Sequence, residues 1–335
     1  MAAEKRIAVV TGGAGFIGSH VCERLLADGQ QVICIDNFIT SDVSNIESML
    51  KNSDFEFIKL DINEAFDLET FPELARFKLN VHGVQEIYHF ACPTSAKKFD
   101  NLRVQTFLAN SVGMRNVLDL AVKYKARLLH ASTAVVYGPR HADGSKFKET
   151  DLGVTNHASP RACYDEGKRF AETACFTYSS VFGLDTRIAR IFRTYGPKQR
   201  LNDGEMVPDF VIDALEGRDL VIYGDENFST ALLFVTDLVD GLVRLMRASK
   251  NPGPVNFGGD EDLKLADVAR KVIAMTNSSV QVKFEAPLLF MTPLGLPETR
   301  KAVDELGWIP LVRLDDGLKR TIEYTLVTKG LAHNI

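Results

Sequence analysis

Short apolar runs rich in β-branched residues alternate with helical patterns through the first half of this chain. Six such runs, each bounded by turn residues, predict strands at residues 6–10, 31–35, 55–60, 84–90, 126–132 and 184–192. Between them, residues 19–29 and 116–125 carry apolar side chains three or four positions apart, which predicts helices with one buried face. Strands that alternate with such crossover helices predict an α/β fold with a doubly wound parallel sheet.

The pattern changes in the second half of the chain. From about residue 194 Pro and Gly become more frequent, and residues 215–224, 252–259 and 294–308 look loop-rich. No internal repeat, low-complexity tract or visible linker marks a boundary. We therefore expect one domain over residues 1–193 and a smaller region over residues 194–335, some segments of which return to the first domain.

Three glycines, Gly12, Gly15 and Gly18, lie between the first predicted strand and the first predicted helix. Glycines at such a junction allow a tight turn, close backbone approach to a pyrophosphate and close packing of the helix on the strand. The triplet alone also fits a structural turn, because its spacing is G-x-x-G-x-x-G. The second predicted strand, however, ends in Asp36, where a carboxylate can bind ribose hydroxyls and would repel a 2′-phosphate. Together the two features predict a Rossmann-type domain that binds NAD rather than NADP.

Residues beside these two features complete the predicted cofactor site. Asp61 ends the third predicted strand, where it either faces the adenine or is a turn residue. The residues predicted to bind NAD are Gly12, Gly15, Phe16, Ile17, Gly18, Asp36, Asn37, Asp61 and Ile62, together with Tyr164 and Lys168.

Tyr164 and Lys168 are four residues apart in the run RACYDEGKRF, residues 161–170. On a helix this spacing places both side chains on one face. A nearby ammonium, together with the positive nicotinamide of an oxidised cofactor, would lower the pKa of the Tyr164 phenol and let it take a proton from an alcohol. By spacing alone the pair also fits a solvated helix face, with Lys168 paired to Asp165.

Composition narrows the class of protein. The formal net charge is −5, and no basic tract interleaved with aromatic residues suggests a nucleic-acid surface. The five cysteines are scattered without a C-x-x-C pair, which argues against a disulfide framework and a metal site. No apolar stretch is long enough for a signal segment or a membrane span. We therefore expect a cytoplasmic protein without nucleic-acid, membrane or metal partners.

The order of these motifs carries a resemblance. The glycine turn is followed by STAVVYG, residues 132–138, and then by the Tyr-x-x-x-Lys pair. This order resembles the extended short-chain dehydrogenase/reductase family, also called the NAD-dependent epimerase/dehydratase family, over nearly the whole chain. The resemblance implies that Thr133 hydrogen-bonds the reacting alcohol, that Tyr164 is the base, and that Lys168 activates Tyr164 and binds the nicotinamide ribose. It also implies a homodimer formed through two helices per subunit.

Within that family, the segments PRACYDEGKRFAE, ARIFRTYGP, LNDG, VTDLVDGL and ELGWIP look most like UDP-glucuronate decarboxylases. The resemblance implies a nucleotide-sugar substrate whose C4 hydroxyl is oxidised with NAD. In those enzymes the resulting β-keto acid loses CO2, and the same cofactor then reduces the ketone. The substrate residues that this resemblance implies are Pro93, Ser95, Thr133, Arg193 and Lys198.

The chain departs from the decarboxylase pattern at the residues of the second step. Ala134 and Val135 stand where those enzymes have Ser and Glu, and Thr230 and Gly295 or Leu296 stand where they have arginines. Such arginines serve decarboxylation or bind the nucleotide diphosphate in the family. Arg193, where relatives have Asn, is a candidate replacement or else a salt-bridge residue, and Lys97, Lys98 and Arg103 are further candidates or solvent-exposed cations.

Four outcomes therefore stay open. The enzyme could decarboxylate UDP-glucuronate, or it could oxidise C4 and then epimerise or only oxidise the sugar. From a different class, the chain could be a non-catalytic NAD-binding protein that lost the sugar site. Asn110 fits either the family's structural Asn or a helix or turn cap, and His89 and Cys92 are expected to pack beneath the cofactor.

Overall fold

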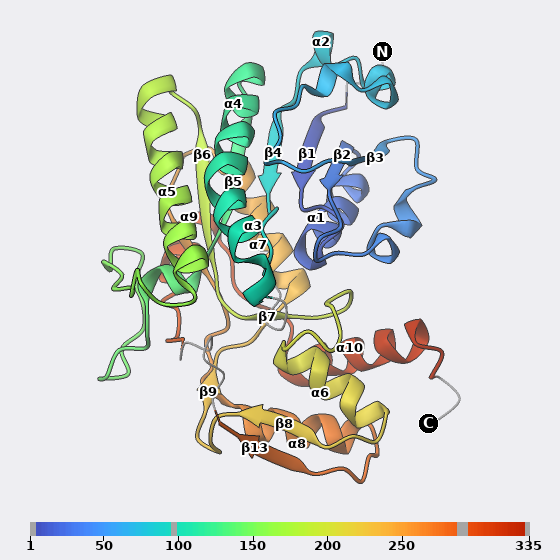
Figure 1. Ribbon diagram of the computed structural model, residues 1–335, viewed down its shortest axis with the longest axis vertical. Helices are drawn as coiled ribbons and strands as arrows, with labels where there is room; N and C mark the ends of the chain where they lie inside the picture. The colour runs from blue at the N-terminus through green and yellow to red at the C-terminus, as the bar shows by residue number, and fades with distance from the viewer. Residues whose placement is uncertain (1–4, 95–98, 287–293, 332–335) are drawn as a thin grey trace.

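A computed structural model describes residues 5–94, 99–286 and 294–331 of the chain. Its centre is a parallel sheet of seven strands in the order β11-β6-β5-β4-β1-β2-β3 (Figure 1). The strands are β1 (Ile7–Thr11), β2 (Gln31–Asp36), β3 (Phe55–Lys59), β4 (Glu86–His89), β5 (Arg127–Thr133), β6 (Thr186–Ile191) and β11 (Val255–Phe257). All six strands predicted from the sequence are present, and the predicted Rossmann-type fold is confirmed.

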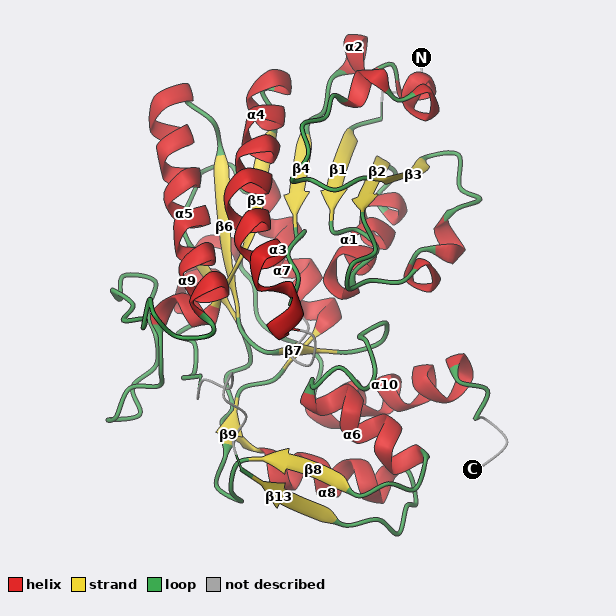
Figure 2. Ribbon diagram, in the orientation of Figure 1, coloured by secondary structure: helices red, strands yellow, loops and turns green. Residues whose placement is uncertain are grey.

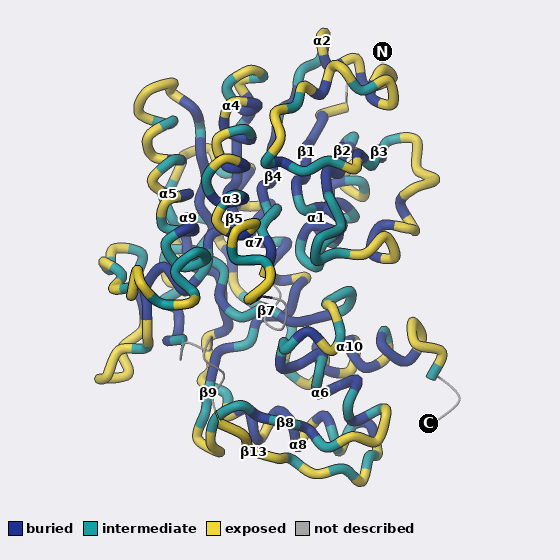
Figure 3. The backbone as a smooth tube through the Cα atoms, viewed as in Figure 1, coloured by how far each residue is buried: buried dark blue, intermediate teal, exposed yellow. Residues whose placement is uncertain are grey.

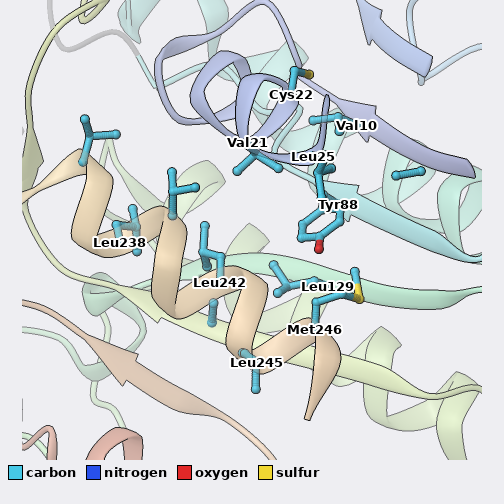
Figure 4. Packing of buried hydrophobic residues seen from close by; sticks show 14 of the residues in the cluster. Val10, Val21, Cys22, Leu25, Tyr88, Leu129, Leu238, Leu242, Leu245 and Met246 are labelled. Carbon is cyan, nitrogen blue, oxygen red and sulfur yellow. The ribbon is translucent and has the colours of Figure 1, made fainter. Parts of the chain in front are cut away.

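Helices cover both faces of this sheet. On one face α4 (Met114–Tyr124) and α5 (Ala162–Phe182) pack on buried residues of the strands. On the other face α1 (Phe16–Ala27) and α7 (Val235–Arg247) contribute side chains such as Leu25 and Leu242 to a shared core, which Figure 4 shows. Burial of strands on both faces explains why their sequences read as continuous apolar runs rather than as alternating ones.

A smaller second body lies beyond the carboxyl ends of the strands (Figures 1 and 2). Its core is built mainly from α6 (Met206–Leu215), α8 (Leu265–Met275), α10 (Leu314–Thr328) and β8 (Leu220–Tyr223). The remaining paired strands are β13 (Val282–Glu285) with β8, β7 (Thr194–Tyr195) with β10 (Leu233–Phe234), and β9 (Ser229–Thr230) with β12 (Leu263–Lys264). The remaining α-helices of the described chain are α2 (Leu79–His82), α3 (Arg103–Leu108) and α9 (Arg300–Leu306).

The prediction that residues 215–224, 252–259 and 294–308 are loop-rich is wrong in part. These segments contain β8, β11 and α9, respectively. The strand β11 pairs with β6, with Val255 opposite Ala189, so a segment from the second half of the chain completes the sheet. Its run of three residues is too short for a periodic signal, and the pairing comes from tertiary contact. The division at residue 193 itself stays a prediction.

Figure 3 shows that the sheet is the most buried part of the fold. Within residues 5–94, 99–286 and 294–331, no helix has both the length and the apolar character required to cross a lipid bilayer.

Candidate active site

A cavity of about 1020 Å³ lies between the carboxyl ends of the strands and the second body. In a doubly wound sheet this edge is where ligands bind, because the loops there diverge and leave a crevice. This volume lies at the upper end of the range of ligand pockets, about 300–1,000 Å³. The predicted site residues in its wall are Gly12, Gly15, Phe16, Ile17, Gly18, Asp36, Asn37, Asp61, Ile62, Pro93, Thr133, Tyr164, Lys168, Arg193 and Lys198. Ser95 lies outside the described residues, as do Lys97 and Lys98.

The glycine turn forms one end of this cavity. Gly12 has φ +71°, and a Cβ there would lie 2.7 Å from the backbone nitrogen of Ala91. A Cβ on Gly18 would lie 2.2 Å from the carbonyl oxygen of Gly12, so a side chain would disrupt the turn. Phe16, Ile17 and Gly18 form the first turn of α1, where backbone N–H groups lack partners within the helix. The turn therefore fits the pyrophosphate of NAD.

Asp36 ends β2 beside this turn. Its carboxylate accepts hydrogen bonds from the nitrogen of Ala14 at 3.0 Å, from the nitrogen of Phe38 at 2.9 Å and from Oγ of Ser41 at 2.7 Å. These three bonds fix the carboxylate in the cavity wall and leave acceptor capacity for a ribose hydroxyl. Asp61 accepts a hydrogen bond from Nδ2 of Asn37 at 3.2 Å, so these two predicted cofactor-binding residues contact each other.

Thr133, Tyr164 and Lys168 form the other end. Thr133 is the last residue of β5, and Tyr164 lies in the first turn of α5. Nζ of Lys168 lies 5.9 Å from the centre of the Tyr164 ring and donates a hydrogen bond to the carbonyl of Ala131 at 2.8 Å. Tyr164 and Lys168 therefore lie on one face of α5, as their spacing predicts. The alternative pairing of Lys168 with Asp165 is not found: Asp165 pairs with Arg161.

Burial shifts the pKa values of both Tyr164 and Lys168 in the protein alone. Burial raises the pKa of the Tyr164 phenol above its ordinary value, the nearby Cys92 thiol adds to the rise, and a hydrogen bond with Thr133 acts in the opposite direction. Burial also lowers the pKa of Lys168. In the protein alone desolvation therefore keeps the pKa of Tyr164 high, and the predicted lowering, which also involves the positive charge of a bound nicotinamide, stays a prediction. Any lowering requires the positive charge of a bound nicotinamide.

A buried ion pair supports α5 behind the reacting side chains. Both carboxylate oxygens of Glu172 bind Arg190 of β6, at 3.0 Å to Nε and 2.7 Å to Nη2. Oγ of Ser132, the neighbour of Thr133, donates to Glu172 at 2.5 Å. The network ties α5 to β5 and β6, the three elements that position Tyr164, Lys168 and Thr133.

The departures from the decarboxylase pattern leave apolar or neutral groups. Ala134 and Val135 are buried, and Val135 lines the cavity beside Thr133. Thr230 is buried, and its hydroxyl donates to the carbonyl of Ala231 at 3.4 Å. A Cβ on Gly295 would lie 2.6 Å from the ring of Phe147, so that backbone has no room for an arginine in this arrangement.

The predicted substrate residues differ in how they are held. Arg193 lies in the cavity wall with a buried Nε that has no hydrogen-bond partner among the described residues. Nζ of Lys198 already has two partners, Oε1 of Glu23 at 2.6 Å and the carbonyl of Asn45 at 2.9 Å. Arg103 pairs with Asp100 and is absent from the cavity lining. The substrate roles of Pro93, Ser95, Thr133, Arg193 and Lys198 stay predictions.

The structure also defines the contacts of Asn110, Cys92 and His89, whose roles the sequence left open. Asn110 lies in a π-helical turn, Ala109–Gly113, and donates from Nδ2 to the carbonyl of Thr106 at 2.9 Å and to Sγ of Cys92 at 3.2 Å, so it is not a helix cap. His89 is buried against Thr11, with Nδ1 2.7 Å from the hydroxyl oxygen, and burial lowers its pKa to about 3.

Other cavity residues were missed by sequence reasoning. Arg161 lies three positions before Tyr164, at helical spacing, and its guanidinium carbon is 5.8 Å from the centre of the Tyr164 ring. The helical spacing of Arg161 and Tyr164 was the sequence signal that could have identified Arg161. No local signal pointed to Glu205 before α6 or to Tyr324 and Thr328 of α10, because distant packing alone brings these segments to the cavity.

Comparisons with known proteins agree with this geometry. A model of the NAD dependent epimerase/dehydratase family matches residues 8–258. UDP-glucuronic acid decarboxylase 1 of Xenopus tropicalis is 38% identical over 320 residues, which are 96% of this chain and 72% of the relative. UDP-glucuronic acid 4-epimerase from Bacillus cereus, solved in complex with UDP-glucuronic acid and NAD, is 27% identical with a TM-score of 0.82, over 96% of this chain and 99% of that chain. The chain therefore belongs to the NAD dependent epimerase/dehydratase family, and it is an NAD-dependent enzyme of the short-chain dehydrogenase/reductase type.

Proposed function

We propose that this enzyme oxidises the C4 hydroxyl of a nucleotide-linked sugar, and that UDP-glucuronate is its substrate. One observation carries the proposal: a single cavity joins a dinucleotide-binding turn at one end to Thr133, Tyr164 and Lys168 at the other. The identity to UDP-glucuronic acid decarboxylases supports the choice of sugar. Modification of a nucleotide sugar with NAD is shared by the relatives, whereas the position oxidised and the product belong to this proposal.

The side chains divide the work of oxidation. Tyr164 takes the hydroxyl proton, and Thr133 holds the same oxygen by a hydrogen bond as the carbon becomes a ketone. Lys168 adds a positive charge beside the phenolate that favours its formation. NAD, when bound, accepts the hydride from C4 and returns it later. Gly12, Gly18 and Asp36 would hold its pyrophosphate and ribose, as their geometry described above allows.

The fate of the ketone follows from the chemistry of the substrate. A uronate oxidised at C4 is a β-keto acid: the bond to the carboxyl carbon breaks, CO2 leaves, and the electron pair left at C5 takes up a proton. The 4-ketone is then reduced by hydride and a proton from Tyr164, so the overall reaction needs no external oxidant. UDP-glucuronate thus yields a decarboxylated UDP-sugar, UDP-xylose.

Epimerisation at C4 is the second candidate. It is favoured by Ala134 and Val135, which place apolar groups where decarboxylases carry Ser and Glu. An epimerase needs only oxidation, rotation of the ketone and reduction from the other face.

The test is to incubate the purified enzyme with NAD and a panel of UDP-, GDP- and dTDP-sugars, UDP-glucuronate among them. Reduced nicotinamide is followed by absorbance, CO2 is trapped, and products are weighed by mass spectrometry. Decarboxylation predicts CO2 and a product lighter by the mass of CO2, whereas epimerisation predicts an isomer of unchanged mass. If no sugar nucleotide in the panel binds or reacts, the proposed substrate class is wrong.

A further inference from the structure

Arg193 is a cation in the cavity wall with few partners in the protein. It lies between β6 and β7, and its carbonyl accepts a hydrogen bond from the nitrogen of Leu233 at 2.9 Å, which fixes the backbone. Its Nη1 contacts Sδ of Met206 at 3.7 Å, and a thioether is only a weak acceptor. Its Nε is buried without a hydrogen-bond partner among the described residues. The guanidinium therefore has unsatisfied donors at the edge of a ligand cavity.

The charges nearest to Arg193 do not neutralise it. Within the described part of the chain, no carboxylate lies within ion-pairing distance of Arg193, although the field of Glu205 acts on it. Glu205 precedes α6 and lines the same cavity. Burial lowers the pKa of Arg193 and raises that of Glu205, so both charges are partly desolvated.

The position of Arg193 places this charge on the substrate side of the cavity. Ile191, at the end of β6, is paired in register with Thr133. Arg193 lies two residues after Ile191, at the carboxyl end of β6 and beside Thr133. The glycine turn follows β1, which β5 and β4 separate from β6. A ligand group that reaches Arg193 therefore belongs to the molecule that reacts at Thr133 and Tyr164.

The chemistry of a guanidinium defines the group that fits. Its planar donors match the two oxygens of a carboxylate or of a phosphate, and such bonds strengthen when the pair is desolvated. We infer that Arg193 binds an anionic oxygen group of the nucleotide-sugar substrate, either the diphosphate or the uronate carboxylate, and that Glu205 opposes this binding. The inference rests on the proposed function, because it takes the substrate to be a nucleotide sugar. It makes Arg193 a specificity-determining residue.

Binding measurements separate the two sources of the anion. The NAD-loaded enzyme and its Arg193→Gln variant are titrated by calorimetry with UDP, UDP-glucose and UDP-glucuronate. If Arg193 binds the diphosphate, all three affinities fall by about 10- to 100-fold, as expected for a lost charge-assisted hydrogen bond. If it binds the carboxylate, only the affinity for UDP-glucuronate falls by that factor. Affinities within about twofold of wild type for all three ligands would overturn the inference.

Control variants keep the result interpretable. Arg300→Gln makes the same change of charge on an exposed residue of α9, and we expect it to leave all three affinities unchanged. Arg193→Lys keeps the charge and should recover part of the lost affinity. Thermal unfolding and NAD binding report whether each variant folds.

Glu205→Gln tests the inference independently of Arg193→Gln. Removing the competing carboxylate should tighten binding of the same anionic ligand severalfold, and this result decides the matter if Arg193→Gln does not fold. Unchanged or weaker binding by Glu205→Gln would count against the inference. A wild-type enzyme that binds NAD but none of the three UDP ligands would instead contradict the proposed function, so the two failures are distinguishable.

Discussion

At the scale of single residues, Tyr164 carries the proposed chemistry. Tyr164→Phe removes the hydroxyl that exchanges a proton with the substrate and leaves the ring in place. We expect kcat to fall by about 10²–10⁴, with NAD affinity nearly unchanged, because general acid–base catalysis contributes a factor of this size. Tyr178→Phe is the matched control on the same helix, since its hydroxyl donates to Asp119 away from the cavity. Steady-state kinetics on both variants decide, and full activity of Tyr164→Phe would contradict the role of Tyr164.

Lys198 is a second residue whose contacts make a prediction. Its ammonium joins Glu23 of α1 to the carbonyl of Asn45, and Nδ2 of Asn45 donates to the carbonyl of Ala14 at 3.0 Å. The loop that carries Lys198 is thereby fastened across the NAD end of the cavity. Lys198→Met removes both hydrogen bonds of the ammonium, and since each contributes about 1 kcal/mol we expect the rate of NAD dissociation to rise at least about tenfold.

The rate is measured by displacement of bound NAD from the purified enzyme. Lys319→Met, which removes an exposed lysine of α10, should leave it unchanged. An unchanged dissociation rate in Lys198→Met would show that this loop does not retain the cofactor.

Residues in local motifs could be predicted from the sequence, whereas residues brought in by distant packing could not. Gly12 and Gly18 lie in the turn between β1 and α1 and in the first turn of α1, respectively, where close backbone approach restricts the residue type, and Asp36 ends β2. Glu205 and Tyr324 reach the cavity only because α6 and α10 dock on each other and against the sheet edge. The burial that raises the pKa of Tyr164 in the protein alone could not be predicted for the same reason, because the degree of burial is a property of the folded molecule.

At the scale of elements, the ion pair between Glu172 and Arg190 holds α5 on the sheet. The two side chains are only 8% and 11% exposed, respectively. Arg190→Met leaves the carboxylate of Glu172 buried without its cation, and we expect the free energy of unfolding to fall by about 3–5 kcal/mol.

Urea denaturation measures this change. Arg270→Met is the control, because Arg270 and Asp267 form a pair on α8 that is 60% and 61% exposed and should contribute less than about 1 kcal/mol. A loss as small in Arg190→Met as in Arg270→Met would mean that the buried pair does not stabilise α5.

The order of elements was predictable only where the chain follows the βα alternation. The six strands before residue 193 have clear apolar runs, and the helices α1 and α4 have clear periodic patterns. The helix α7 also has a regular apolar stripe, including Leu238, Leu242 and Leu245, but no local pattern shows that it covers the face of a sheet formed by earlier strands. Likewise β11 joins that sheet through tertiary pairing.

At the scale of the whole molecule, we propose that the enzyme is a homodimer formed through α3 and α5. The inner face of α5 packs on the sheet through residues such as Ala171 and Cys175. Its outer face exposes Phe170, at 54%, and the neighbouring α3 exposes Phe107, at 56%. Large apolar side chains gathered on adjacent helices mark an interaction surface, and a second copy offers the same surface.

A double variant, Phe107→Glu with Phe170→Glu, should shift the enzyme from dimer to monomer, because each copy would place charges in the apolar contact. Sedimentation equilibrium gives the mass. The exposed Leu152→Glu is the control, since Leu152 lies on the loop before α5 rather than on α3 or α5. A wild-type enzyme that sediments as a monomer would refute the proposed dimer.

The cytoplasmic location expected from the scattered cysteines also stays a prediction.

The central claim is that Tyr164 removes the proton of the C4 hydroxyl group while the hydrogen on C4 leaves as hydride. The most direct measurement uses UDP-glucuronate carrying deuterium at C4, incubated with the NAD-loaded enzyme and stopped before turnover is complete. Mass spectrometry of the recovered nicotinamide cofactor should show deuterium with the wild-type enzyme and almost none with Tyr164→Phe. Conversion of the sugar with deuterium found neither in the cofactor nor at C4 of the product would contradict the account.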